Sequence, residues 1–352
     1  MTADHDPIGE VIVGVDTHLD QHTAVAINGL GQVLDAIEIP TTTDGFKTLV
    51  AWAGELGRFD RAGVEGCGAY GATLMRHLRA EGITVIEVDR PNRQRRRRRG
   101  KSDPTDAEAA ARAVLAGDAT GLPKEMNGRV EAVRILHLTR RSAVKAQVQA
   151  GNQIKDVVLT APEPIRDQLR DLSTKQRVKL CARWRPGPVT DPTSAARRAL
   201  RDLARRWLAL AAEIKALEVD LLRLLRALVP NLIGEHGAGI DVAAKLVIAV
   251  GENPHRLRNE ATFAALCGTS PIEASSGKHT AHRLNRGGNR HANNALHTVT
   301  MHRWRTCPET HAYIERRRAE GKTDRAIRRC LKRALARRFH RLLVADLSRA
   351  LT

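Results

Sequence analysis

The chain has 352 residues, and its 58 Lys and Arg outnumber its 39 Asp and Glu, which gives a formal net charge of +19. Such a charge argues against a typical metabolic enzyme and indicates a polyanionic partner, above all nucleic acid, whose phosphates Lys and Arg neutralise. An anionic membrane surface is disfavoured because the sequence has neither a run of about 18 apolar residues nor a signal peptide, so we expect a cytoplasmic, nucleoid-associated protein.

The first 90 residues alternate between β-rich and helical patterns. Residues 11–39 form three β-rich runs, separated at 17–22 and at the Asn-Gly-Leu-Gly sequence 28–31, which is a hairpin signal. We therefore expect an antiparallel meander. Further elements follow in the order helix (44–57), strand ending at Glu65, helix (72–81), strand (83–88) and a helix from Asp103. The order βββ-α-β-α-β-α predicts a ribonuclease-H-like mixed sheet.

Four acidic residues fall where the ribonuclease-H-like fold presents metal ligands, at the ends of the first and fourth strands and on a late helix. They are Asp16, Glu65, Asp103 and Asp106. Mg²⁺ prefers oxygen ligands, and two ions about 4 Å apart stabilise the attacking and leaving oxygens in phosphoryl transfer. Each acid alone also has a structural explanation: Asp16 as a turn residue, Glu65 as a strand end. Asp103 would then be the N-cap of a helix whose first residue is Pro104.

The sequence Gly-Cys-Gly-Ala-Tyr-Gly at 66–71 matches the GxGxxG fingerprint of dinucleotide-binding folds. Glu87 or Asp89 follows at about the spacing of a ribose-binding acid. However, the motif follows the fourth predicted strand instead of the first, comes directly after the charged Glu65 and leads towards an arginine run. We favour a structural role, in which the glycines allow close packing where the chain leaves the strand.

A run of basic residues precedes the helix that begins at Asp103. It contains Arg93, Arg95, Arg96, Arg97, Arg98, Arg99 and Lys101. In most proteins such a run is a solvated face. Beside a carboxylate cluster in a chain of this net charge, we interpret it as a grip for phosphates that steers a nucleic-acid backbone towards the metals.

The middle of the chain is dominated by helical patterns. Residues 129–160 read as a helix, proline-containing segments follow at 162–164 and 186–192, and a long apolar stripe begins after Thr193. Its members are Leu200, Leu203, Trp207, Leu210, Ile214, Leu217, Leu221, Leu224 and Leu228. Their alternating steps of three and four fit either a helix packed within the chain against 129–159 or an intermolecular coiled coil. We expect a coiled coil and a dimer or higher oligomer.

Composition indicates what the cores are made of. Aromatic residues are only 3% of the chain, so the cores must be built from Leu, Val, Ile and Ala, which favours helices. The cysteines are Cys67, Cys181, Cys267, Cys307 and Cys330. They contain no CxxC pair and suggest neither a zinc site nor disulfides, so we expect them to be reduced and mostly buried.

The last 120 residues contain several helical signals. Residues 233–252 hold a Gly-Ala-Gly turn followed by a helix of small residues, which is typical of a helix-hairpin-helix element. The turn of such an element offers backbone N–H groups to a DNA phosphate. A plain helical hairpin is an equal alternative. Residues 313–343 read as two basic amphipathic helices.

A Ser-Ser-Gly sequence at 275–277 is followed by basic and polar side chains. We predict that these side chains bind nucleic acid: Lys278, Arg283, Arg286, Asn289 and Arg290. The turn is either a phosphate loop or the seat of a serine nucleophile, with arginines that stabilise the developing charge on phosphorus. Both alternatives stay open here because no His or Asp base stands at a fixed spacing from the serines.

Two long stretches of the sequence resemble the DEDD transposases of bacterial insertion sequences, the one-ten family. GVDTH, VEGCGAYG and GKSDPTDAEAAARAVLAG, which hold the four acids, resemble the RuvC-like domain of that family. LCGTSPIEASSGKHTAHRLNRGGNRHANNALH resembles its C-terminal transposase domain. We therefore expect a RuvC-like domain at 9–125, a helical coiled-coil region at 126–229 and a mainly helical transposase domain at 230–352.

The resemblance implies an enzyme that excises and inserts its element, guided by a structured non-coding RNA that pairs with donor and target DNA. It implies Mg²⁺ ligands, with Mn²⁺ as an alternative ion, at Asp16, Glu65, Asp103 and Asp106. It also implies that Ser276, or its neighbour Ser275, forms a 5′-phosphoserine with cut DNA. In the family, coiled coils join protomers and the acids of one subunit meet the serine of another, so we expect a dimer that assembles into a tetramer.

Two rival functions are compatible with the same acids. The first is a Holliday-junction-resolvase-like nuclease that uses water as its nucleophile, which leaves the C-terminal domain unexplained. The second is a non-catalytic scaffold that binds nucleic acid and in which the acids are structural.

Overall fold

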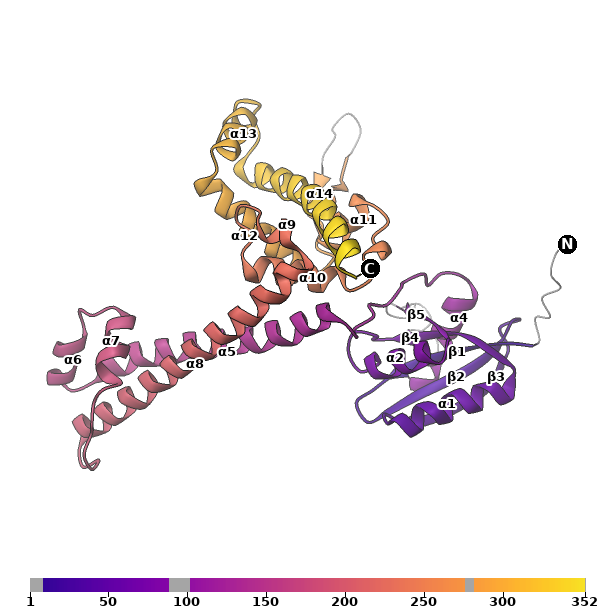
Figure 1. Cartoon of the computed structure of the whole chain (residues 1–352), viewed down its shortest axis with the longest axis horizontal. Coiled ribbons are helices and arrows are strands. Elements are labelled where there is room, and N and C mark those ends of the chain that lie inside the picture. Colours follow the sequence, from indigo (N-terminus) through magenta and orange to yellow (C-terminus); the bar gives the residue numbers. More distant parts are fainter. Residues whose placement is uncertain (1–8, 89–101, 276–281, 352) are drawn as a thin grey trace. The chain divides into compact units, whose positions relative to one another are not determined.

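A computed structural model describes residues 9–88, 102–275 and 282–351 of the chain (Figure 1). The chain divides into two compact units. The first contains Met1–Gly128 and the short segment Gly251–Arg256, and the second contains Arg129–Val250 and Leu257–Thr352. The acidic candidates belong to the first unit and the serine candidates to the second. The expected division into three parts stays a prediction.

The first unit is built on a five-stranded mixed sheet. Its strands are β1 (Glu10–Thr17), β2 (Gln21–Asn28), β3 (Val33–Pro40), β4 (Arg58–Glu65) and β5 (Thr84–Val88). They lie in the order β3-β2-β1-β4-β5, with β1–β2 and β2–β3 antiparallel and β1–β4 and β4–β5 parallel. The predicted meander is confirmed. Because β1 and β4 run in parallel, their carboxyl ends meet at one edge of the sheet.

Helices cover both faces of this sheet. They are α1 (Thr43–Leu56), α2 (Ala72–Ala80) and α4 (Asp103–Leu115). Val13 and Val15 of β1 pack with α1 and α2, whereas Ile12 of the same strand packs with α4. Successive side chains of a strand point to opposite faces, so β1 contributes to both layers. Among the described residues of the first unit, the predicted order of strands and helices is confirmed.

The helix predicted from Asp103 is confirmed, because α4 begins at that residue, and only its N-cap differs from the structural explanation of Asp103 given above. Ser102 is the N-cap, with backbone angles φ −144° and ψ 148°, and Asp103 is already the first helical residue. The reason is that the Ser102 carbonyl oxygen accepts the first helical hydrogen bond, from the Asp106 backbone N–H at 3.1 Å. Asp103 and Asp106 therefore both lie in the first turn, where the helix dipole favours negative charge.

The second unit contains a long helical hairpin. Its helices are α5 (Arg129–Thr160), α6 (Glu163–Leu169), α7 (Thr174–Cys181) and α8 (Pro192–Leu228). α5 and α8 pack against each other, and α6 and α7 close one end of the hairpin (Figure 1). Ile154 and Leu200 lie in the core at that end, and Leu221 and Leu228 in the core at the other. The stripe of α8 therefore packs within the chain, and association between copies stays a prediction.

The rest of the second unit is mainly helical. Its elements are α9 (Pro230–Ile233), α10 (Ile240–Val250), α11 (Glu260–Leu266), β6 (Ile272–Glu273), β7 (His282–Arg283), α12 (Arg290–Thr306), α13 (Pro308–Ala319) and α14 (Asp324–Leu351). Phe263, Leu296 and Phe339 are buried in one core that α10, α11, α12 and α14 share. The predicted hairpin around the Gly-Ala-Gly turn is present, although α9 has only one turn, and its contact with DNA stays a prediction.

Two expectations from composition can be compared with these helices and their cores. Cys67, Cys181 and Cys267 are buried, whereas Cys307 and Cys330 are half-buried, so the cysteines are mostly buried as expected. Burial raises the pKa of the Cys67 and Cys267 thiols to about 12, which keeps them protonated and unreactive. Among the described helices, none combines the length and the apolar character that a membrane span requires.

Candidate functional site

Two neighbouring strands end in the same pattern, a glycine, a valine and an acid. In β1 this is Gly14-Val15-Asp16, and in β4 it is Gly63-Val64-Glu65. The parallel register pairs the two glycines with each other and the two valines with each other. Both valines lie in the core under α1 and α2. Because side chains alternate along a strand, Asp16 and Glu65 take the opposite face, the one that α4 covers.

The two glycines let α4 approach the sheet closely. A Cβ atom at Gly14 would overlap the Ala107 carbonyl oxygen, and one at Gly63 would lie only 2.8 Å from the Ala110 carbonyl oxygen. Small side chains on α4 match this approach, since Ala107, Ala110 and Ala111 are all buried against the sheet. The first turn of α4 is thereby held beside the ends of β1 and β4.

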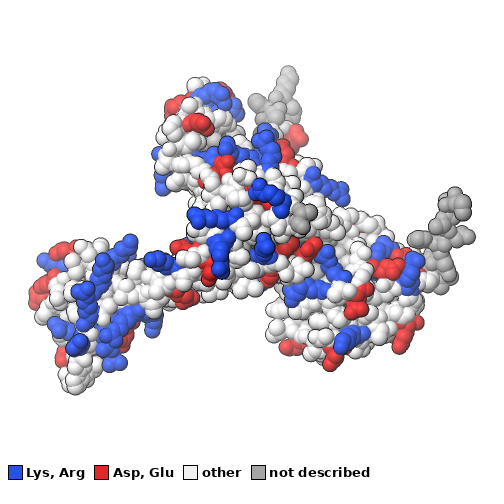
Figure 2. Space-filling model, in the orientation of Figure 1, with Lys and Arg blue, Asp and Glu red and all other residues white. Residues whose placement is uncertain are grey.

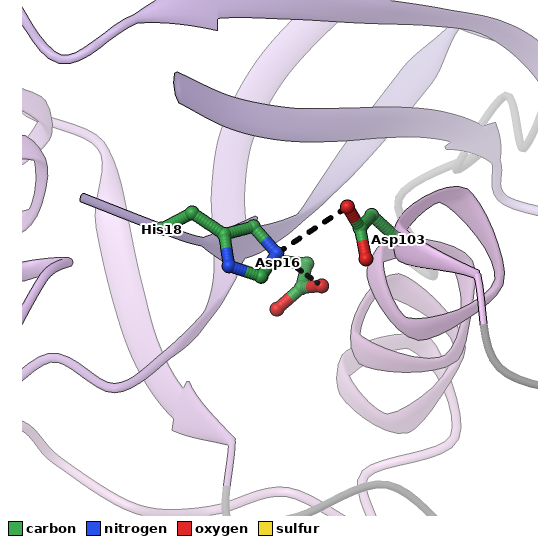
Figure 3. A group of neighbouring side chains, drawn as sticks. All are labelled: Asp16, His18 and Asp103. Atoms are coloured by element: carbon green, nitrogen blue, oxygen red, sulfur yellow. Dashed lines mark ion pairs between the residues drawn. The ribbon is translucent and has the colours of Figure 1, made fainter. Parts of the chain in front are cut away.

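His18 joins the strand end to the helix. Its Nε2 atom lies 3.2 Å from Oδ2 of Asp16 and 3.4 Å from Oδ2 of Asp103 (Figure 3). One ligand atom from each of these three residues lies within 4.8 Å of the others. The Asp16 side chain is 11% exposed, whereas those of His18 and Asp103 are each 46% exposed. The cluster is therefore anchored in the protein on one side and open to solvent on the other.

Several carboxylates repel one another at this point. Burial raises the pKa of Asp16 above its ordinary value, the neighbouring His18 opposes this shift, and the charges of Asp103 and Asp106 add to it. Asp106 is itself only 2% exposed. Three acids of like charge near one another disfavour simultaneous ionisation unless a cation lies between them. The arrangement therefore suits a cation.

Backbone contacts fix the segment that carries His18. The His18 backbone N–H donates a hydrogen bond to Nδ1 of the buried His22 at 3.3 Å, and the His22 ring stacks on Phe46. Burial lowers the pKa of His22, which favours the neutral ring that this acceptor role requires. The Thr17 hydroxyl donates to the Glu65 carbonyl oxygen at 2.9 Å and ties the ends of β1 and β4 together. The acids therefore stand on a fixed backbone.

A cavity of 450 Å³ opens beside the cluster. Its lining consists of His18, Leu19, Asp20, Gln21, Thr23, Glu38, Tyr70 and Asp103. Three of these side chains are carboxylates, and none of the described lining residues is Lys or Arg. A phosphodiester would be repelled from such a cavity unless cations intervened.

The donor atoms suit a divalent metal ion. Carboxylate oxygens are the ligands that Mg²⁺ and Mn²⁺ prefer, and an imidazole nitrogen is a further donor for transition metals such as Mn²⁺. Asp16 and Asp103 come together through His18, Asp106 is an electrostatic neighbour of Asp16, and Glu65 ends the adjacent strand on the same face. The structure thus brings Asp16 and Asp103 into one group with His18, whereas Glu65, at the end of β4, and Asp106, in the first turn of α4, are not members of that group.

Sequence reasoning missed His18. Its only signal is the Asp-Thr-His sequence at 16–18, which places the imidazole two residues after an acid in an extended segment. Positions two apart in an extended chain point the same way, so the ring turns towards the carboxylate of Asp16.

The Gly-rich sequence at 66–71 has a structural explanation at two of its three glycines. Gly66 has φ +68°, a conformation that side chains rarely adopt. A Cβ atom at Gly71 would lie 3.0 Å from Val64 and 3.1 Å from Thr17, so this glycine allows close packing beside the strand end. At Gly68 a Cβ atom would meet nothing within 4 Å. These observations support the structural role over a dinucleotide site.

The remaining candidates lie elsewhere. Arg93, Arg95 to Arg99, Lys101, Ser276 and Lys278 lie outside the described residues. In the second unit the described ones are Ser275, Arg283, Arg286, Asn289 and Arg290. Ser275 is exposed just after β6, and Arg283 ends β7. The Asn289 side chain caps α12 by accepting hydrogen bonds from two backbone N–H groups, those of His291 and Ala292. Arg286 and Arg290 are exposed.

Comparison with known proteins gives matches over both units. A family model of DEDD transposases of the IS110 type, described as Transposase, matches residues 13–161, and one described as Transposase IS116/IS110/IS902 family matches residues 232–315. An uncharacterised protein of the insertion element IS110 from Streptomyces coelicolor is 34% identical over 125 residues. That match covers 34% of this chain and 30% of the relative.

The two matches include both sets of candidates. The first contains all four acids, with His18 between them, and the second contains both serines and the basic residues that follow. Together they extend over most of the chain in the order that the sequence resemblance implied. The chain belongs to the IS110 family of insertion-sequence transposases.

Proposed function

We propose that the protein cleaves and rejoins DNA strands during excision and insertion of its element, with Mg²⁺ as the metal. The single observation that carries this proposal is the cluster of Asp16, His18 and Asp103 at the ends of β1 and α4. It lies inside the segment that matches the DEDD transposases, and membership of that family implies use of a divalent metal.

The metal ligands in this proposal are Asp16, Glu65, Asp103 and Asp106. When bound, two divalent ions would stabilise negative charge on the phosphorus oxygens during strand cleavage. The chain supplies the geometry for them: Asp16 and Glu65 are fixed by the paired strands, and the close seat of α4 fixes the other two. His18 contacts both Asp16 and Asp103 and is a candidate nitrogen ligand.

The proposed nucleophile is Ser276, with Ser275 as the alternative. Its Oγ forms a bond to phosphorus while the bond from phosphorus to the 3′ oxygen of the strand breaks. The serine proton is transferred in sum to that oxygen, which leaves as a 3′-hydroxyl, and the 5′ end stays on the serine. Attack by a 3′-hydroxyl of another strand reverses these bonds and frees the serine. Ser275 is exposed just after β6, which supports the proposal that DNA can reach a serine hydroxyl in this segment.

DNA and a structured guide RNA are the proposed partners. The basic run at Arg93 to Lys101 and the side chains of Arg283, Arg286 and Arg290 are proposed to bind their phosphates. A further basic region supports this proposal, because residues 161–206 hold twelve Lys and Arg against five Asp and Glu. Figure 2 shows them crowded on the end of the helical hairpin, over α6, α7 and the start of α8.

We also propose that copies of the chain associate through the helical hairpin, as a dimer that assembles into a tetramer. Apolar side chains on the outside of the hairpin support this, since Leu138, Val148 and Val219 are more than half exposed. Exposed apolar groups on paired helices are typical of interfaces. In such an assembly the acids of one subunit would meet the serine of another.

A resolvase-like nuclease is the second candidate function. It is favoured by one observation, that the acid cluster and its cavity are complete within the first unit. With water as nucleophile, such an enzyme would cut DNA without a covalent intermediate.

One experiment separates these functions. The protein is incubated with Mg²⁺, the guide RNA and labelled donor DNA, and the products are resolved on denaturing gels. A DNA–protein adduct that Ser276→Ala abolishes and that the exposed control Ser142→Ala retains supports the transposase. Protein-free nicks support the resolvase, and intact DNA supports a scaffold. Loss of the adduct in Ser275→Ala alone would move the nucleophile to Ser275.

A further inference from the structure

A cavity beside the hairpin of β6 and β7 lies wholly in the second unit. It has a volume of 460 Å³, and its walls come from residues 268–271, residues 282–285 and residues 322–337. The first two segments flank the hairpin of β6 and β7, whose strands pair Ile272 with Arg283. The third covers the start of α14. The cavity is therefore formed at the base of the hairpin that leads to Ser275.

The charge of this cavity is strongly positive. Six of its lining residues are cationic: Arg283, Lys322, Arg329, Lys332, Arg333 and Arg337. None of the described lining residues is Asp or Glu. The Glu260 carboxylate pairs with two of the cations, at 3.1 Å from Arg333 and 2.7 Å from Arg337. Positive charge therefore exceeds the negative charge around the cavity, and the fitting ligand is an anion.

Two of the cations are in unfavourable surroundings that a bound anion would improve. Nη1 of Arg333 is buried and has no hydrogen-bond partner among the described residues. Burial lowers the pKa of Lys332, whose Nζ donates a hydrogen bond to Oδ1 of Asn293 at 2.6 Å. A buried donor without an acceptor and a buried ammonium are both stabilised when an anionic oxygen approaches.

Part of the remaining lining is apolar. Pro271, Leu284, Ala326 and Ala334 contribute to it, and the Leu284 side chain is 49% exposed. A free phosphate would leave these groups in contact with water. The volume is in the usual range for pockets that hold a small organic ligand, about 300–1,000 Å³. A ligand with an apolar planar part and an anionic part would contact both the apolar and the cationic parts of the lining.

We propose that this pocket holds one unpaired DNA nucleotide, with its phosphate on the cations and its base against the apolar wall. The proposal rests on the proposed function and deepens it. Ser275 follows Pro271 by four residues, so an extended chain limits the separation of their Cα atoms to about 14 Å. The nucleotide therefore flanks the phosphodiester on which the serine acts. Taking it out of the stack fixes the strand relative to the serine, independently of its sequence.

The first test measures binding to the full-length protein without any cleavage. Calorimetry with dAMP is compared with 2-deoxyribose 5-phosphate, which lacks the base. Ala326→Leu fills the apolar wall without changing charge, Arg329→Ala removes one cation, and Arg341→Ala removes an exposed cation of α14 outside the pocket. We expect dAMP to bind about tenfold more weakly to the first two variants and unchanged to the third.

The native cysteines give a second readout of the same binding. Cys330 lines the pocket, whereas the half-buried Cys307 does not. We expect dAMP to slow alkylation of Cys330, measured by mass spectrometry, and to leave Cys307 unchanged. Equal affinity for the sugar phosphate would reduce the site to a phosphate site and overturn the proposal. A tenfold preference for AMP over dAMP would assign it to RNA and also overturn it.

The second test uses donor DNA with 2-aminopurine next to the cleaved bond, in the assembly with guide RNA and Mg²⁺. Unstacking raises its fluorescence, so we expect a rise with the wild type and with Arg341→Ala but not with Ala326→Leu. An adduct that forms without any rise at either flanking position overturns the pocket and leaves the proposed function standing. Binding of dAMP that depends on Ala326, without any adduct, supports the pocket while the proposed function fails.

Discussion

The sheet of the first unit and the last three helices of the second carry opposite charge. Residues 9–88 hold eleven Asp and Glu against five Lys and Arg, whereas residues 290–351 hold five against sixteen. Figure 2 shows the surplus of Lys and Arg on the surface over α13 and α14. An acidic body binds cations and repels DNA, and a basic one does the reverse. The proposed strand cleavage needs both kinds of region.

The two regions also hold their charges by different means. In the first, short side chains stand on the backbone of β1, β4 and α4, and glycines set the distance between these elements. In the second, long Arg side chains are held by shared carboxylates, as when Glu235 pairs with Arg303 and Arg338. A single substitution in the sheet should therefore have a large effect, whereas a single substitution among the arginines should have a small one.

The largest effect is expected from removing one acid of the cluster. Asp16→Asn keeps the shape of the side chain but removes its charge, so cleavage of donor DNA should fall by about a thousandfold or more, since a bound metal contributes several kcal/mol. Binding of the guide RNA should stay nearly unchanged. Asp60→Asn, at the other end of the sheet and paired with Arg58, is the matched control. Retained cutting would remove Asp16 from the site.

The next effect concerns the packing of α4 against the sheet. Gly14→Ala places a methyl group against the Ala107 carbonyl oxygen, so unfolding free energy should fall by about 1–3 kcal/mol, as for other overpacked sites. Gly68→Ala meets nothing within 4 Å and should change it by less than about 0.5 kcal/mol. Chemical denaturation measures both. Equal stability of the two variants would mean that the close approach of α4 does not depend on Gly14.

Much of the first region could be predicted from the sequence, because its signals are local. Alternating apolar residues predicted the strands, and acids at strand ends predicted which side chains share one edge. The N-cap of α4 was wrong by one residue, since Ser102 and Asp103 are both good caps and only the observed hydrogen bond decides between them. His18 was missed because a histidine after a strand has no distinctive pattern.

The second region could be predicted less well, because its site depends on contacts between distant segments. The helices and the stripe of α8 follow from periodicity, but the stripe has the same pattern whether it packs on α5 or on another copy. The cationic pocket combines residues 268–271, residues 282–285 and residues 322–337 at the start of α14. No local pattern signals such a combination, and basic side chains in a helix are usually solvated.

A smaller effect is expected at His18, where the first region departs from pure oxygen ligands. His18→Ala should weaken Mn²⁺ binding about tenfold and change Mg²⁺ binding little, because imidazole is a better donor to transition metals than to Mg²⁺. Calorimetry of the metal-free protein with each ion measures this without DNA. His255→Ala, at an exposed position, is the control. Equal losses for both ions would show that His18 only positions the acids.

The smallest effect is that of Asp16→Asn on the free energy of unfolding. It measures how much the repulsion in the acidic cluster destabilises the folded protein. Burial raises the pKa of Asp16, His18 opposes the shift, and Asp103 and Asp106 add to it, so the folded protein holds the Asp16 proton more tightly than the unfolded chain does. The contribution of Asp16 to wild-type stability should then fall as pH rises from the unfolded pKa, about 3.9, through the raised folded value. Above that value Asp16→Asn, which resembles the protonated acid, should be more stable by about 1 kcal/mol.

The pH dependence of that difference separates charge repulsion from a general effect of the substitution. The gain of Asp16→Asn should vanish below about pH 3.9, where the wild-type residue is protonated in both states. Added Mg²⁺ should stabilise the wild type and reverse the order, because only the wild type keeps the full set of ligands. Thermal unfolding across pH, with and without the ion, measures both. If Asp16→Asn were less stable at neutral pH without metal, His18 would outweigh the repulsion, and the acidic edge would need no cation to hold it together.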